Sequence, residues 1–169
     1  MSILSHVHGL FGILITMKRK AYLFDIDGTL ANIEPYLHHI RNINNNPDFK
    51  KDYDTFHKES VNANANLDVK NMLDNARYHG HDILIFTSRK NSWRPETNFW
   101  LLKNGIHHDA LFMRSNSNTD THAKVKKDML SEAARYWDIV FAIDDNPSIV
   151  QMLREQGIET MQYGSWYGE

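Results

Sequence analysis

The chain has 169 residues, 41% of them hydrophobic, and a formal net charge of −2 at pH 7. This length suits one domain with room for a small insert, and the hydrophobic share excludes a globally disordered chain. The near-neutral charge excludes a uniformly basic nucleic-acid-binding protein, so an anionic partner must meet a local basic surface. The sequence contains no cysteine. Disulfides, thiolate zinc sites and cysteine nucleophiles are therefore excluded, and a reducing cytoplasm is the expected location.

Residues 1–16 differ from the rest of the chain. Their apolar stretch at 10–15 is far shorter than the ~20 residues that span a bilayer. It also lacks the basic start and the small-residue cleavage site of a signal peptide. Met17 is followed by three basic residues and then by a predicted strand. We treat residues 1–16 as an N-terminal extension, with an amphipathic membrane anchor as the alternative, and expect the domain to cover residues 17–169.

Five short apolar runs follow along the chain. Where they are long enough to judge, they are continuously apolar, which is typical of strands covered on both faces of a parallel sheet. The runs are 21–26, 83–87, 110–113, 139–143 and 160–162.

Four helical patterns lie between the later runs. Asp68 is the expected cap of the first, while Pro95 and Pro147 open the second and the fourth, and Gly80, Gly105 and Gly157 follow the ends of those three. The alternation of strands and helices predicts an α/β fold, a doubly wound parallel sheet with right-handed crossovers. The residues expected to face inward are Val69, Met72, Leu73, Ala76, Phe99, Leu102, Val125, Met129, Ala133, Trp137, Ile149, Val150 and Leu153.

The segment 31–66 interrupts this alternation. It has no strand-like run and contains two asparagine-rich pieces, 42–46 and 62–66. We expect a small insert of one or two short helices above the end of the first strand. A polar loop without regular structure is the alternative.

Two carboxylates stand at the end of the first apolar run. Asp25 and Asp27 are separated by one residue and followed by Gly28 and Thr29. Side chains at i and i+2 of an extended chain project to the same side, here into the crevice beyond the strand where open α/β sheets bind ligands. Gly28 allows a sharp turn and lets backbone amides approach an anion. The alternative is an ordinary Asp-Gly turn.

A second acidic pair, Asp144 and Asp145, ends the fourth apolar run. Adjacent unpaired acids at the end of a buried strand repel each other and need a cation, and an oxygen-rich site without cysteine suits magnesium. The alternative is that one of them caps the helix beginning at Pro147 while the other is solvated. At a switch point of the sheet, both acidic pairs would meet at one site.

Hydroxyl and basic groups complete the candidate site. Thr87, Ser88 and Arg89 lie at the end of the second run, where a hydroxyl and a cation can bind phosphate or a nucleotide. A simple Thr-Ser turn would leave the same pattern. Lys124, Lys126 and Lys127 form a basic cluster on the third helix, either as a solvated face or with one lysine reaching inward to balance the acids.

Taken together, these residues resemble the four signature motifs of the haloacid dehalogenase (HAD) superfamily, in the family's order. The resemblance implies a five-stranded Rossmann-like core with the nucleophile at the end of the first strand. It implies that Asp25 forms an aspartyl-phosphate and that Asp27 is the general acid and then the general base. Thr87 and a lysine would hold the phosphoryl oxygens. Magnesium would contact Asp25, the carbonyl of Asp27 and Asp144, with Asp145 close by. The acid at position 27 favours a phosphatase over a dehalogenase.

A closer resemblance is to the 3′-phosphatase domain of bacteriophage polynucleotide kinase-phosphatases, which act in nucleic-acid repair. This likeness rests on the segments 87–89, 109–114, 125–126 and 142–159. It implies Lys126 as the motif lysine and Gly28, Thr29, Ser88, Arg89 and Arg114 as substrate-side residues. The sequence departs from the family at Ser88, often a glycine, and at Asn146, often an arginine. It contains no kinase phosphate-loop motif.

The expected substrate is a phosphorylated nucleic-acid end or a nucleotide. A polynucleotide would need basic residues along the crevice, whereas a free nucleotide would place its base under the insert against aromatic side chains. A catalytically silent phosphate-binding module is an alternative of another class. We expect the pairs His38-His39 and His107-His108 to be surface residues rather than metal ligands, because neighbours in a helix diverge. The basic candidates are Lys50, Lys51, Lys58, Arg89, Arg94 and Arg114, and the aromatic candidates are Tyr36, Tyr53 and Phe56.

Overall fold

The computed structural model describes residues 17–164. The expectations for residues 1–16 and for Trp166 and Tyr167, which could pack on the core or form a dimer contact, lie outside this range. Five parallel strands form one sheet in the order β3-β2-β1-β4-β5, which confirms the predicted doubly wound α/β class. The strands are β1 (Arg19–Phe24), β2 (Asp82–Lys90), β3 (Ala110–Arg114), β4 (Trp137–Asp144) and β5 (Glu159–Gln162).

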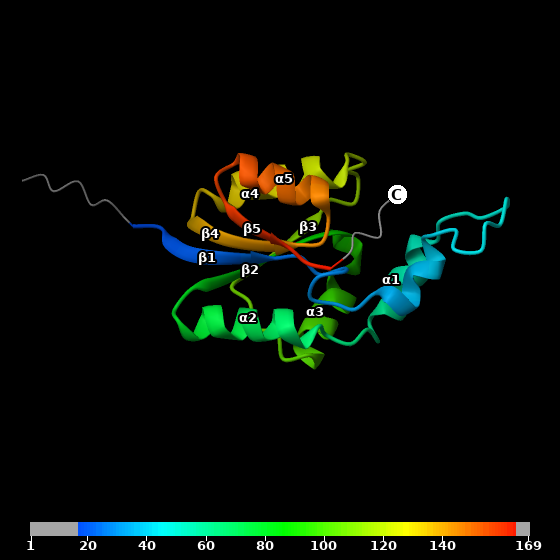
Figure 1. Cartoon of the computed structure of the whole chain (residues 1–169), viewed down its shortest axis with the longest axis horizontal. Coiled ribbons are helices and arrows are strands. Elements are labelled where there is room, and N and C mark those ends of the chain that lie inside the picture. The colour runs from blue at the N-terminus through cyan, green and yellow to red at the C-terminus, as the bar shows by residue number, and fades with distance from the viewer. Residues whose placement is uncertain (1–16, 165–169) are drawn as a thin grey trace, which may run out of the picture.

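Helices cover both faces of this sheet. Helices α2 (Leu67–Tyr78) and α3 (Arg94–Lys103) lie on one side, and α4 (His122–Ala133) and α5 (Pro147–Glu155) lie on the other (Figure 1). Successive residues of β2 feed the two cores in turn, because side chains alternate along a strand. Ile83 and Ile85 join the core under α2 and α3, whereas Leu84 and Phe86 join the core under α4 and α5.

The segment 31–66 leaves this layered body at the carboxyl end of β1. It contains a short 3-10 helix, η1 (Glu34–His39), and helix α1 (Tyr53–Ser60), which lie beyond the end of the sheet rather than over either face (Figure 1). Backbone hydrogen bonds join its two ends, from Asn32 N to the Asn64 carbonyl at 2.9 Å and from Asn66 N to the Leu30 carbonyl at 2.8 Å. The insert is therefore anchored where it departs from the sheet and returns to it.

Some expected helix details are wrong. Phe99 and Leu102 are 57% and 75% exposed, because α3 instead docks through Trp100 and Leu101, which are buried. The indole Nε1 of Trp100 donates to the Ala63 carbonyl at 2.8 Å, which selects this face of the helix. Met72, also expected to face inward, is 43% exposed.

Two helix boundaries also differ from expectation. Asn66, not Asp68, occupies the N-cap position of α2, and Asp68 lies in its first turn. Trp137 begins β4 instead of ending the third helix, and its Nε1 donates to Asp82 Oδ2 at 2.6 Å. Trp137 thus links β4 to β2.

No helix within residues 17–164 is long and apolar enough to cross a membrane.

Candidate active site

The two acidic pairs converge beyond the carboxyl ends of β1 and β4. These strands are neighbours, and the amide of Asp25 donates to the Ile143 carbonyl at 3.1 Å, which fixes the two ends side by side. Carboxylate oxygens of Asp25, Asp144 and Asp145 lie within 4.8 Å of one another. All three residues are buried. Groups more than a hundred positions apart in the sequence therefore form one acidic cluster.

Lys126 compensates part of this negative charge. It projects from α4 and is 2% exposed. Its Nζ donates to Asp144 Oδ2 at 2.6 Å and also to Asp25 Oδ1. Burial lowers the pKa of Lys126, but the two carboxylates outweigh burial and the net shift is upward, so the ammonium stays charged. Of the three lysines in the basic cluster, Lys124 and Lys127 are exposed.

One lysine does not neutralise three acids. Burial, together with the neighbouring carboxylates, raises the pKa of Asp25 to about 7 and that of Asp145 to about 9. These shifts mean that the charged forms lack sufficient countercharge. An all-oxygen donor set with excess negative charge fits a hard divalent cation such as Mg²⁺, which Asp25, Asp144 and Asp145 could hold.

Gly28 makes the close packing of this cluster possible. Its φ is +88°, and a Cβ at this position would lie 2.2 Å from Asp145 Oδ2. Only glycine tolerates both the left-handed backbone and this contact. Asn146, not an aspartate, caps α5 by accepting from Ser148 N at 2.9 Å, so the capping alternative for the second acidic pair is wrong.

Asp27 and Arg89 form a bidentate ion pair. The guanidinium donates from Nε to Asp27 Oδ2 at 2.8 Å and from Nη2 to Asp27 Oδ1 at 2.6 Å. Arg89 is 1% exposed and is also within hydrogen-bonding distance of Ser60 and Thr97 hydroxyls. Burial raises the pKa of Asp27, but Arg89 outweighs burial and the net shift is downward. No local pattern in the sequence indicates that Arg89, at the end of β2, binds Asp27.

The remaining predicted residues lie around this centre. Thr87 is buried, and its Oγ1 accepts from Arg89 N at 3.2 Å. Ser88 Oγ is buried without a partner in the described part of the chain, as is Thr29 Oγ1. Arg114 donates to the carbonyls of Ser88 at 3.1 Å and Asp120 at 2.7 Å. These bonds tie the end of β3 to β2 and to the segment between β3 and α4.

A cavity of about 570 Å³ opens above the acidic cluster. Its floor includes both acidic pairs, Ser88, Arg89 and Lys126, and its wall comes from the insert. Of the basic candidates named from the sequence, Lys51 and Arg89 line it, and of the aromatic candidates Tyr53 and Phe56 do. Several lining residues could not be identified as such from the sequence. Those of the insert, whose fold local patterns do not reveal, are Ile33, Leu37, Ile40, Arg41, Asn42, Ile43, Phe49 and His57. Those at the beginnings of α4 and α5 are His122, Asn146 and Ile149.

Solved structures share this fold. The chain matches a protein of a Pnkp1/Rnl/Hen1 RNA repair complex at 24% identity and a TM-score of 0.73, covering 90% of this chain but only 45% of that one. It also matches a class C acid phosphatase from Bacillus anthracis with tungstate bound, at 17% identity and a TM-score of 0.68, covering 90% of this chain and 69% of that one. A HAD family enzyme from Bacteroides thetaiotaomicron, described as a magnesium complex, matches at 12% identity and 0.51, covering 89% and 96%.

Sequence comparison identifies the family directly. Among curated proteins, no sequence matches this chain. The family model described as "Polynucleotide kinase PNKP phosphatase domain" matches residues 19–165, which is most of the chain. This match confirms the resemblance predicted from the motifs. The chain therefore belongs to the family of PNKP phosphatase domains, which are phosphatases of the HAD type.

Proposed function

We propose that this protein is a Mg²⁺-dependent phosphomonoesterase that works through an aspartyl-phosphate on Asp25 and removes 3′-phosphates from polynucleotide ends. The observation that carries this proposal is the convergence of Asp25, Asp144 and Asp145 around the ammonium of Lys126 at the floor of the cavity. A carboxylate in that position can approach a phosphate only where cations surround it.

The reaction follows from the order of these groups. A carboxylate oxygen of Asp25 attacks phosphorus, the bond from phosphorus to the ester oxygen breaks, and Asp27 gives its proton to the departing alkoxide. Asp27 then accepts a proton from the water that attacks the aspartyl-phosphate, which releases inorganic phosphate and restores Asp25. Lys126 and the buried hydroxyl of Thr87 orient the phosphoryl oxygens. Asp25, Asp144 and Asp145 would hold Mg²⁺, which would neutralise negative charge on the transferring group.

Arg89 has a defined place in this scheme. Its ion pair lowers the pKa of Asp27 and keeps this carboxylate ionised, which suits a base but not an acid. A phosphate entering the floor competes for the same guanidinium. We expect the substrate to draw Arg89 away from Asp27, so that burial then raises the pKa of Asp27 and lets it carry the proton.

The insert wall supports a nucleotide-bearing substrate. The aromatic residues Phe49 and Tyr53 line the cavity together with Arg41 and Lys51, whereas Phe56 is buried and packs in the core. Aromatic faces stack on bases, and cations bind a phosphodiester backbone. Arg94, another basic candidate named from the sequence, donates to the Leu111 carbonyl instead of lining the cavity. The basic lining supplied by the insert favours a polynucleotide end, which carries further phosphates beyond the one removed.

A free nucleotide is the second candidate, because a cavity of this size with an aromatic wall also suits one nucleoside. The two are separated by comparing kcat/KM for a 3′-phosphorylated oligonucleotide, its 5′-phosphorylated counterpart and nucleoside monophosphates, each with Mg²⁺. We expect the 3′-phosphorylated oligonucleotide to be preferred. Preference for the monophosphates would replace the polynucleotide proposal. Absence of turnover on all three, with p-nitrophenyl phosphate also inert, would favour a silent phosphate-binding module.

A further inference from the structure

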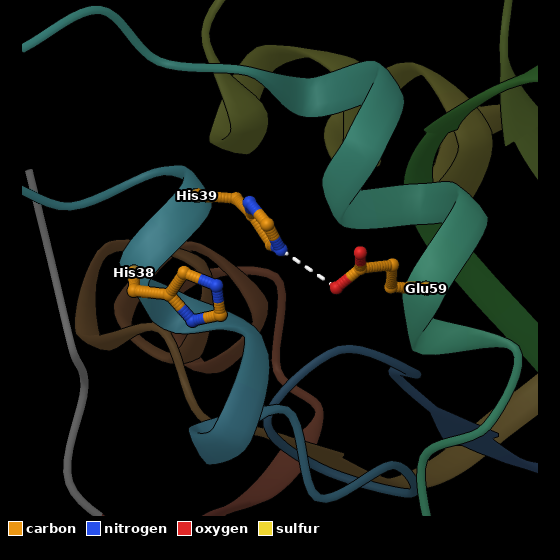
Figure 2. Close-up of side chains that lie close together, drawn as sticks. All are labelled: His38, His39 and Glu59. Carbon is orange, nitrogen blue, oxygen red and sulfur yellow. Dashed lines mark hydrogen bonds and ion pairs between the residues drawn. The ribbon is translucent and has the colours of Figure 1, made fainter.

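A second group of potential metal ligands lies in the insert, separate from the acidic cluster. His38 and His39 end η1, and Glu59 lies near the end of α1 (Figure 2). Each offers one ligand atom, and the three atoms lie within 4.8 Å of one another. The two elements are also joined by the backbone bond from Asp52 N to the His39 carbonyl at 2.8 Å.

The side chains are oriented as ligands would be. His39 Nε2 lies 2.8 Å from Glu59 Oε2, and the two point toward each other (Figure 2). The His38 ring packs against the His39 ring with centroids 3.9 Å apart. His38 Nδ1 donates to the Pro35 carbonyl at 3.0 Å, which leaves Nε2 as the ring nitrogen that can bind a metal. A backbone carbonyl that fixes the tautomer in this way is the usual partner of a metal-binding histidine.

We propose that His38, His39 and Glu59 bind a transition-metal ion, with zinc the expected one, at a site independent of the magnesium centre. Two imidazoles and a carboxylate suit Zn²⁺ or Co²⁺ better than Mg²⁺, which prefers oxygen ligands alone. Ligand atoms around one tetrahedral ion lie about 3.3–3.5 Å apart. The 2.8 Å distance between His39 Nε2 and Glu59 Oε2 must therefore lengthen slightly when the ion binds, and the longer distances among the three ligand atoms must shorten. The His38 and Glu59 side chains are exposed enough to make this movement.

The histidine pair was expected to be surface residues because adjacent helical residues diverge. The structure leaves His38 exposed, as expected, but Glu59 of another element supplies the third ligand that sequence spacing does not show. An ion at this site would tie η1 to α1. Those elements contribute Leu37, Tyr53 and Phe56 to the cavity wall, so the ion would hold the substrate-facing wall in one arrangement.

The test is a Co²⁺ titration of the full chain in excess Mg²⁺, followed by the visible absorption of tetrahedral cobalt. His6 and His8 are replaced by alanine in every sample to remove a chelate within the N-terminal extension. We expect one equivalent to bind. Glu59→Gln, which keeps the side-chain shape, and His39→Ala should each weaken binding by at least about tenfold. His79→Ala, an exposed histidine at the end of α2, is the matched control and should change nothing.

A further variant separates this site from the magnesium centre. Asp144→Asn should leave the cobalt spectrum and affinity unchanged, even though it impairs the proposed phosphatase. Equal cobalt affinity in the unmodified and the Glu59→Gln proteins would overturn the inference. Loss of the cobalt signal in Asp144→Asn alone, or no tetrahedral cobalt at all, would overturn it as well.

Discussion

The carboxyl edge of the sheet and the insert handle charge in opposite ways. At the edge, Asp25 and Asp144 are buried and both accept hydrogen bonds from the buried Lys126. In the insert, Glu59 is 49% exposed and its partner His39 is 16% exposed. Buried charges are costly unless partners are fixed in advance, whereas exposed ones can rearrange at little cost. This difference supports the proposal that the edge carries out the chemistry while the insert adapts to a ligand.

The sharpest test of the edge is Asp25→Asn, for which we expect phosphatase activity to fall by at least about 10³-fold. The fold should survive, because Lys126 keeps its bond to Asp144 and the crowded cluster loses one charge. Steady-state rates and thermal unfolding measure the two effects. A variant with the full rate would show that the nucleophile is another group.

Lys126→Met should reduce activity by about 10²-fold or more and destabilise the fold by about 3–5 kcal/mol, since it leaves two buried carboxylates without their shared partner. Added Mg²⁺ should recover part of that stability. Lys124→Met, two positions away on the exposed face of α4, is the control and should alter neither property. Equal effects of the two substitutions would contradict the claim that Lys126 alone of the two lysines balances the buried carboxylates. Chemical unfolding with and without Mg²⁺ provides the measurement.

Arg89→Met should destabilise the protein near pH 7 by about 3 kcal/mol, because it leaves Asp27 without its partner. Arg89 lowers the pKa of Asp27, so the ion pair stabilises the native protein above the ordinary aspartate pKa and is lost as pH falls through the lowered value. In the variant, protonation of Asp27 relieves the penalty at a higher pH. The stability difference should therefore shrink on acidification. Urea unfolding of both proteins from pH 7 downward measures this difference in unfolding free energy. A difference that stayed constant with pH would contradict the role assigned to the ion pair.

The smallest effect is expected in the insert. Tyr53→Ala should raise KM for an oligonucleotide substrate about fivefold and leave kcat nearly unchanged. KM for p-nitrophenyl phosphate, which reaches only the floor, should not change. Tyr78→Ala, exposed on α2, is the control. A fall in kcat with unchanged KM would mean that Tyr53 acts in the chemical step. The insert would then not be limited to substrate binding, as the comparison with the sheet edge assumes.

Sequence reasoning succeeded best where chemistry follows strand ends. The five strands follow from the five apolar runs. The meeting of Asp25 with Asp144 follows because two of these runs end in carboxylates and parallel strands bring their carboxyl ends to one edge. The face of α3 could not be predicted, since its docking depends on a bond from Trp100 to the insert. The partners of Arg89 and Glu59 could not be predicted either. Each is a contact between elements whose relative position local patterns do not encode.

The central claim is that Asp25 accepts the phosphoryl group beside a magnesium ion held by the acidic cluster. A crystal structure grown with Mg²⁺ and beryllofluoride, a mimic of a phosphoryl group, tests this most directly. We predict a beryllofluoride adduct on a carboxylate oxygen of Asp25, Mg²⁺ bonded to Asp25 and Asp144, and Lys126 in contact with a fluorine. An adduct on another residue, or Mg²⁺ bound away from Asp144, would contradict the account.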